Sequence, residues 1–279
     1  MEKHQRNASA NGKIAEYLSQ TYLYPSTLDT FVYASQLLQA QAMQYGVEHW
    51  RRHRGQCMGT LIWQLNDCWP VTSWASIDYY GRWKALHYYE KRFFAPVLVS
   101  CEEEGTLTQD PNVNAEPFPL KKSARLNVCN ETRQEFRGTV RWSLRRPDAS
   151  VIREGSAEVT VPALSAVWLD RMDFDDQDTY GCYFAYSLED GAGAPAGSGT
   201  VLFCAPKHFR FEDPKLEARP EGNEIVVTAG AYARSVEIQC GPGTVLEDNY
   251  FDMNAGTRRI RILRGKAKDM KVRSVYDIR

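Results

Sequence analysis

The chain has 279 residues, of which 43% are hydrophobic and 25% charged, and no apolar run is long enough to cross a bilayer. This length favours two or three domains, and the composition is typical of a soluble globular protein rather than a membrane protein. The 34 basic and 35 acidic side chains nearly cancel, so the net charge of −1 gives no basis for binding nucleic acid.

The cysteines argue against a disulfide framework and against a zinc site, because their number is odd and they include no CxxC pair. Widely spread cysteines of this kind favour reduced thiols and therefore a cytoplasmic protein. The polar residues 1–13 contain no apolar stretch and predict no signal peptide. The seven cysteines are at positions 57, 68, 101, 129, 182, 204 and 240.

The first third of the chain has an α/β pattern. Apolar residues recur every three or four positions from Ser26 to His53, which predicts a long helix. The apolar run Cys57–Leu65 has no polar alternation and predicts a strand that is buried on both faces. After the aromatic loop 66–81, helical spacing returns over Arg82–Phe93. We therefore expect a helix, a buried strand and a second helix.

From Val97 onward the pattern changes to short strands separated by turn residues, which is typical of antiparallel sandwiches. One sandwich is predicted up to residue 206, with a hairpin loop at 190–199, and a second, smaller one follows it. The predicted strands are 126–129, 138–144, 157–161, 166–170, 180–187, 200–204, 224–228, 234–239, 258–263 and 271–275.

A dense run of aromatic and polar residues, Gly59–Tyr89, resembles the eighth strand and following loop of β-mannosidases in glycoside hydrolase family 2. It contains the segments WQLNDCWP, beginning at Trp63, and DYYGRW, beginning at Asp78. The later stretch Asp248–Asp252, followed by Gly256, resembles the terminal immunoglobulin-like domain of the same enzymes. Together these resemblances cover nearly all of the chain.

The resemblance implies a multidomain fold that combines α/β and all-β parts. Residues 1–96 would be the end of a catalytic (β/α)8 barrel, with its last strand and helices. Residues 97–206 and 207–279 would be two immunoglobulin-like β-sandwiches.

The implied activity is the hydrolysis of terminal, non-reducing β-D-mannose residues of oligosaccharides, with retention of configuration and without a metal or other cofactor. Retention needs two carboxyl groups about 5–5.5 Å apart. By the resemblance, both catalytic glutamates would precede Met1, so we expect no catalytic residue within the chain and no activity of the chain alone.

The residue that we expect to contact substrate is Trp63. In the family, the corresponding tryptophan forms part of the floor of the −1 sugar subsite, and the carboxyl end of a barrel strand is where such sites lie. Asn66, Asp67, Trp69 and Trp74 are further candidates, which either shape the rim of the site or hold the loop together.

Two acidic residues follow the predicted strand, and each has an alternative to a catalytic role. Asp67 follows an asparagine in a turn, and Asp78 precedes Tyr79 and Tyr80 in another. Aspartates in turns commonly bond to nearby backbone N–H groups. We therefore expect structural roles for both.

A second function class also fits the sequence: an accessory carbohydrate-binding or structural β-sandwich module of a glycosidase. The predicted helix–strand–helix part favours an enzyme, because a binding module has no need of it. The expected partner is a β-mannoside oligosaccharide, bound in the parent enzyme. The expected strand edge would also favour contact with the missing barrel segments or self-association.

Overall fold

The computed structural model describes residues 4–5, 7–105 and 121–278. Contacts between residues divide the chain into two compact units, and the division falls inside one long helix, α2 (Leu28–Arg52). Unit 1 comprises Met1–Tyr45, Thr60–Lys91 and Glu212–Arg279, and unit 2 comprises Gly46–Gly59 and Arg92–Phe211. The domain boundaries at 96/97 and 206/207 stay predictions.

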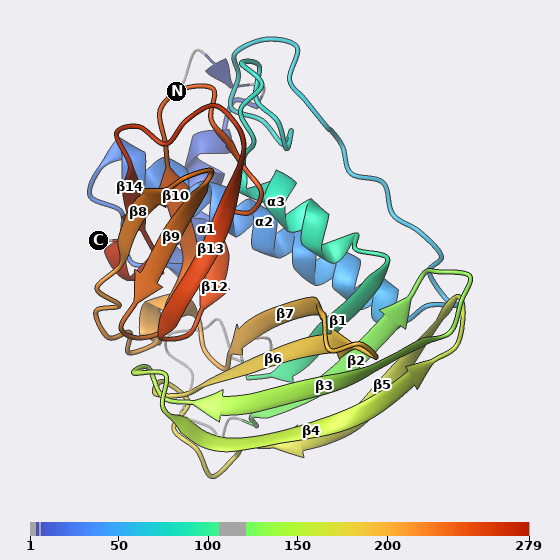
Figure 1. Ribbon diagram of the computed structural model, residues 1–279. Coiled ribbons are helices and arrows are strands. Elements are labelled where there is room, and N and C mark those ends of the chain that lie inside the picture. The colour runs from blue at the N-terminus through green and yellow to red at the C-terminus, as the bar shows by residue number, and fades with distance from the viewer. Residues whose placement is uncertain (1–3, 6, 106–120, 279) are drawn as a thin grey trace. The chain divides into compact units, whose positions relative to one another are not determined.

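Unit 2 is built around an antiparallel sandwich of two sheets (Figure 1). One sheet has the strand order β1-β2-β5, and the other has the order β4-β3-β6-β7. Hydrophobic side chains of both sheets meet in a single core. The strands are β1 (Val97–Glu104), β2 (Ser123–Asn130), β3 (Phe136–Arg145), β4 (Val151–Val161), β5 (Ser165–Asp173), β6 (Tyr183–Asp190) and β7 (Pro195–Leu202).

An aromatic cluster fills the centre of this core. The ring of Phe184 stacks on Trp142 at a centroid distance of 5.9 Å, and Phe174 lies 5.7 Å from Phe184. The Trp142 ring leaves no room for a side chain at Gly155 on the neighbouring strand β4, where an added Cβ would lie 2.6 Å from the ring. The side chains of β3 that point inward therefore pack into one dense core, while those between them point outward.

Cysteines are part of this packing. Cys101 and Cys182 are buried in the core of unit 2, and all seven cysteines, each in the described part of the chain, are free thiols. Burial raises the pKa of Cys182 to about 11 and raises the pKa of Cys101 as well. Both thiols therefore remain protonated near neutral pH.

Unit 1 contains a second antiparallel sandwich, with strand orders β12-β10-β14 and β11-β13-β9-β8 in its two sheets. Its core gathers aliphatic side chains from both sheets, among them Ile225, Val236 and Ile260. The strands are β8 (Glu217–Glu221), β9 (Glu224–Ala229), β10 (Ala233–Gln239), β11 (Val245–Leu246), β12 (Phe251–Met253), β13 (Gly256–Arg264) and β14 (Lys271–Arg273).

The helices confirm most of the helical prediction. Helix α2 differs from the predicted range Ser26–His53 by two residues at its start and one at its end. Helix α3 (Ala85–Phe93) begins three residues after the predicted Arg82. Helix α1 (Ala10–Thr21) was not predicted. No helix of the described residues is long and apolar enough to span a membrane.

Each predicted strand of the two sandwiches has a counterpart in the structure, but β1, β8, β11 and β12 were not predicted. Two boundaries also need correction. The hairpin loop predicted at 190–199 is shorter, since β7 already begins at Pro195 and pairs with β6. The run predicted as a strand at 271–275 ends at Arg273 and continues as a 3₁₀ turn, Val275–Asp277. The Gly- and Ala-rich sequence around Pro195 does not show where β7 begins. Ser274 caps the 3₁₀ turn, and a single serine does not show that the strand ends before it.

The prediction of a buried strand at Cys57–Leu65 is wrong. These residues form an irregular segment, and Leu61 is 100% exposed. A strand requires neighbours that accept and donate its backbone hydrogen bonds, and no described strand pairs with this segment. An apolar run alone therefore does not make a strand.

We expect the backbone amides of Leu61–Gln64 to exchange with deuterium faster than those of Val140–Leu144 in β3. In the described residues, none of the former donates a backbone hydrogen bond, whereas β3 is paired on both sides, with β4 and β6. Hydrogen exchange on the isolated chain measures this difference. Equal protection of the two groups would mean that another part of the chain covers Leu61–Gln64.

Candidate functional site

The candidate site lies in the connection between α2 and α3, in the part from Thr60 onward, which belongs to unit 1. Two stretches of this connection run side by side: Ser76 N donates to Gln64 O at 3.1 Å, and Ile77 N donates to Leu65 O at 2.8 Å. Asn66 and Ile77 also form a parallel bridge. This pairing places residues 63–67 alongside residues 75–78 and gives the irregular connection a fixed backbone.

Trp63 stands immediately before this paired stretch. Its side chain is 74% exposed, and the peptide bond to Gln64 is cis. An exposed indole presents a flat apolar face, the kind of surface that suits the C–H face of a sugar ring. Trp63 is therefore accessible, although the strand that was predicted to carry it is absent, and its contact with substrate stays a prediction.

Asp67 is only 5% exposed and has two side-chain partners. Ser73 Oγ donates to Asp67 Oδ1 at 2.6 Å, and Lys84 Nζ lies 3.4 Å from Oδ2. The backbone N–H of Asp67 donates to Ile77 O. The carboxylate therefore joins both stretches of the connection to the residue just before α3, which fits a structural role.

Asp78 holds a tight turn. Its Oδ1 accepts from the backbone N–H groups of Tyr80 and Arg82, each at 2.9 Å, and its Oδ2 pairs with Arg82 Nε. With all of its contacts inside the turn, Asp78 has the structural role expected from its sequence context.

The other candidates are placed by contacts of their own. Trp69 stacks on His4 at a ring distance of 6.0 Å, and Trp74, which is partly exposed, accepts a bond at its backbone oxygen from Gln39 Nε2 at 2.8 Å. Asn66 is exposed, and its side chain donates to Asp67 O. The site contains no group of three or more His, Cys, Asp or Glu side chains placed to hold a metal ion, a finding that extends to all described residues.

Sequence reasoning did not single out Tyr79 and Tyr80 as candidates. Both are exposed, their rings meet edge to face at 5.3 Å, and the Arg82 guanidinium lies 5.2 Å from the Tyr80 ring centre. Two adjacent aromatic residues between an aspartate and a glycine are a signal that a turn presents rings to solvent.

Two family models match the sandwich part of the chain. A mannosidase Ig/CBM-like domain matches residues 122–208, and an Ig-fold domain of mannosidases matches residues 211–278. The two matches lie next to each other and fit the two sandwiches.

Similar proteins include several β-mannosidases B of Aspergillus. β-Mannosidase B of Aspergillus terreus is 33% identical over 165 residues, which are 53% of this chain and 19% of the relative. β-Mannosidase B of Aspergillus niger is 42% identical over 95 residues, or 33% of this chain and 11% of the relative. The chain therefore matches less than a fifth of the length of these relatives.

Solved structures with a similar fold come from glycosidases. A β-D-mannosidase from Dictyoglomus thermophilum matches 98% of this chain and 33% of its own, with a TM-score of 0.81 at 23% identity. An exo-chitosanase from Amycolatopsis orientalis matches 93% of this chain and 35% of its own, with a TM-score of 0.63 at 15% identity. At these identities the likeness is one of fold.

Proposed function

We propose that this chain forms the carboxy-terminal part of a retaining exo-β-mannosidase of glycoside hydrolase family 2, because its sandwiches match mannosidase family models and the chain is similar to β-mannosidases in sequence and fold. Such an enzyme removes terminal, non-reducing β-D-mannose residues from oligosaccharides. The observation that carries the proposal is the identity of 33–42% to β-mannosidases B. In this proposal, α2, α3 and the connection between them are the end of a (β/α)8 barrel.

The chemistry of this reaction needs two carboxyl groups on either side of the glycosidic bond, one as nucleophile and one as acid and base. Asp67 is bound to Ser73 and Lys84, and Asp78 is bound within its turn, so neither is available for these roles. We therefore assign the catalytic pair to a part of the enzyme outside this sequence.

The contribution of the chain itself is a wall of the sugar pocket. Trp63 offers an exposed ring to the substrate, and the paired backbone of residues 63–67 and 75–78 holds it in place. Asn66, Trp69 and Trp74 belong to the same connection and shape the rim. Asp67 acts by fixing the connection rather than by touching the sugar.

The second candidate function is an accessory carbohydrate-binding or structural module of a glycosidase. It is favoured by the extent of the two sandwiches, whose strands run from Val97 to Leu202 and from Glu217 to Arg273 in the part of the chain that the structure describes. In that case, binding to β-mannan would depend on the sandwiches and not on Trp63.

The chain alone is expected not to hydrolyse p-nitrophenyl β-D-mannopyranoside, because covalent catalysis and proton transfer both require groups that it does not supply. A chimera in which it replaces the structurally matched third of the Dictyoglomus thermophilum β-D-mannosidase, a match that covers 98% of this chain, is expected to hydrolyse this substrate. In the chimera, Trp63→Ala should lower kcat/KM by about 100-fold, equivalent to about 2.7 kcal/mol of transition-state binding.

The matched control is Trp50→Ala in the same chimera, which removes an exposed tryptophan of α2 outside the connection. It should leave kcat/KM within about twofold, as exposed side chains away from a site usually do. A folded chimera without activity, or equal effects of the two substitutions, would contradict the proposal. Binding of the chain to β-mannan that persists in Trp63→Ala would favour the accessory module.

A further inference from the structure

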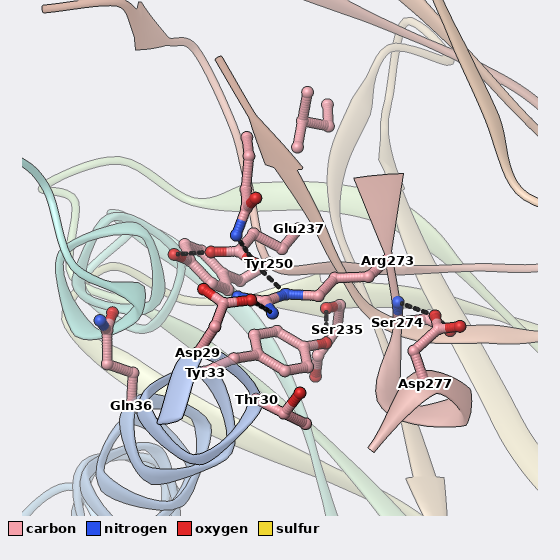
Figure 2. Close-up of polar contacts among 12 residues, drawn as sticks. Asp29, Thr30, Tyr33, Gln36, Ser235, Glu237, Tyr250, Arg273, Ser274 and Asp277 are labelled. Carbon is pink, nitrogen blue, oxygen red and sulfur yellow. Dashed lines mark hydrogen bonds and ion pairs between the residues drawn. The ribbon is translucent and has the colours of Figure 1, made fainter. Parts of the chain in front are cut away.

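The two helices that flank the candidate site both contact the same residue of the carboxy-terminal sandwich, Ser235. On α2, the Tyr33 hydroxyl donates to Ser235 O at 2.6 Å, and on α3 the Tyr89 hydroxyl lies 3.2 Å from Ser235 Oγ. Ser235 is fully buried, and Figure 2 shows its contact with the Tyr33 side chain. One residue of β10 thus joins both helices.

Tyr250 joins the same helices through its ring. Its centroid lies 6.3 Å from that of Tyr33 on α2 and 5.8 Å from that of Tyr88 on α3. Ser235 and Tyr250 both have a φ of 52°, in the left-handed region that non-glycine residues rarely adopt. Backbone strain of this kind persists only where the surroundings fix the conformation, and such places often have a function.

The surroundings of both residues do fix them. Ser235 N donates to Asp252 Oδ1 at 2.8 Å, and the Tyr250 hydroxyl donates to Glu237 Oε1 at 2.8 Å. Arg273 pairs with the same glutamate, and its guanidinium lies 4.4 Å from the Tyr33 ring centre (Figure 2). Ser235, Tyr250, Glu237 and Arg273 thus form a connected set of contacts around Tyr33.

The hydroxyl groups of Tyr33 and Tyr250 keep their protons. Burial, followed by the nearby Glu237 carboxylate, raises the pKa of Tyr33 and of Tyr250 well above the usual value for tyrosine. Both therefore act as hydrogen-bond donors throughout the physiological pH range.

From Tyr33 the contacts continue along α2 to the candidate site. Gln36 and Gln39 follow at intervals of three residues, so each of these side chains neighbours the next along the helix. Gln36 Oε1 accepts from Ala85 N, the first residue of α3, at 3.0 Å, and Gln39 Nε2 donates to Trp74 O at 2.8 Å. The helix that Ser235 holds thus also holds both ends of residues 74–85.

We propose that Ser235 and Tyr250 are positioning residues through which the carboxy-terminal sandwich sets the backbone position of residues 74–85. The sandwich then fixes the positions of α2 and α3 through these two residues, a role that we call the clamp, and it is not an independent module. This role goes beyond the proposed function, and it can be tested without a substrate, so that failure of either proposal leaves the other standing.

Hydrogen exchange on the full chain tests the clamp in the variants Tyr33→Phe, Tyr89→Phe and the two together. Each substitution removes one hydroxyl, and a hydrogen bond of ordinary strength corresponds to about a fivefold change in the opening equilibrium. We expect the amides of Ser76, Ile77 and Ala85 to exchange about fivefold faster in each single variant and at least about 20-fold faster in the double variant. The amides of β9 and β13 should change by less than about twofold.

The control is Tyr24→Phe, which removes a hydroxyl from a side chain that is 72% exposed, and which should change none of these rates. Unchanged exchange at Ser76, Ile77 and Ala85 in the double variant would overturn the proposal. Equal acceleration in β9 and β13 would also overturn it, because it would indicate a general loss of stability.

Ser235→Gly keeps the test decisive if the double variant does not fold. Glycine adopts a φ of 52° without strain and retains the carbonyl that binds Tyr33, but it lacks the Oγ that meets Tyr89. The clamp then predicts about fivefold faster exchange at Ala85, with β9 and β13 unaffected. No change at Ala85 in this variant would overturn the proposal.

Discussion

Replacing Phe184 by alanine is expected to lower the free energy of unfolding of unit 2 by about 3–5 kcal/mol. The Phe184 side chain is 0% exposed and meets three aromatic rings, those of Trp142, Phe174 and Tyr186. Removing it takes away buried apolar surface and leaves a cavity, because large neighbouring rings on paired strands collapse into the space only in part. Urea titration, followed through the exchange of amides in β3 and β6, measures the loss.

The matched control is Val151→Ala on β4 of the same sheet, where the side chain is partly exposed. Its effect should stay within about 0.5 kcal/mol. A loss below about 1 kcal/mol for Phe184→Ala would contradict the packing of the aromatic cluster described for unit 2.

Most of the sandwich strands could be predicted because alternation and turn residues mark them locally, whereas β1, β8, β11 and β12 were not predicted. Strand β3, for example, pairs with β4 directly after it, and alternation along β3 matches the buried and exposed faces of one sheet. Local turn residues and a period of two were therefore sufficient signals. The exact ends of β7 and β14 were not predictable, since pairing and capping rather than composition decide where a strand ends.

The segment Cys57–Leu65 shows the opposite case. Its apolar side chains have the character of a buried strand, but whether such residues form a strand depends on neighbours that the segment itself does not specify. The structural role of Asp67 could be expected from local hydrogen-bonding chemistry, whereas its partner Lys84 could not, because that contact depends on how the connection folds back.

Contacts between distant parts of the chain gave no signal in the sequence. Tyr33 and Ser235 are 202 residues apart, and neither the helical period of α2 nor the strand pattern of β10 identifies the other. The apolar periodicity predicted the helix, but the polar bonds made by Tyr33 and Gln36 are visible only in the folded unit.

The pair of Glu237 and Arg273 gives the second large expected effect. Glu237 is buried, accepts from the Tyr250 hydroxyl and pairs with the largely buried Arg273. Changing Glu237 to glutamine preserves the shape of the side chain but leaves the Arg273 guanidinium without its buried counter-charge. Losing one member of a buried pair costs about 3–5 kcal/mol, and we expect the lower end because Arg273 keeps its contact with Asp29.

Two variants separate the charge effect from other causes. Asp29, the outer partner of Arg273, has a side chain that is 70% exposed. Asp29→Asn should therefore lower the free energy of unfolding by less than about 1 kcal/mol. Glu237→Leu combined with Arg273→Met removes both buried charges, and should cost less than Glu237→Gln alone, since a buried pair is often replaced by apolar residues at little cost.

The free energy of unfolding of unit 1, measured by urea titration with exchange at the amides of β9 and β13, distinguishes these outcomes. If the double variant is less stable than Glu237→Gln, the shape and hydrogen bonds of the pair matter more than its charge balance. If Asp29→Asn lowers the free energy of unfolding as much as Glu237→Gln does, the contact of Arg273 with Asp29 contributes as much stability as its contact with Glu237. The burial of Glu237 would then not explain the effect of Glu237→Gln. The expected order, with Glu237→Gln the most damaging, follows from the difference in exposure between the two carboxylates that share one guanidinium.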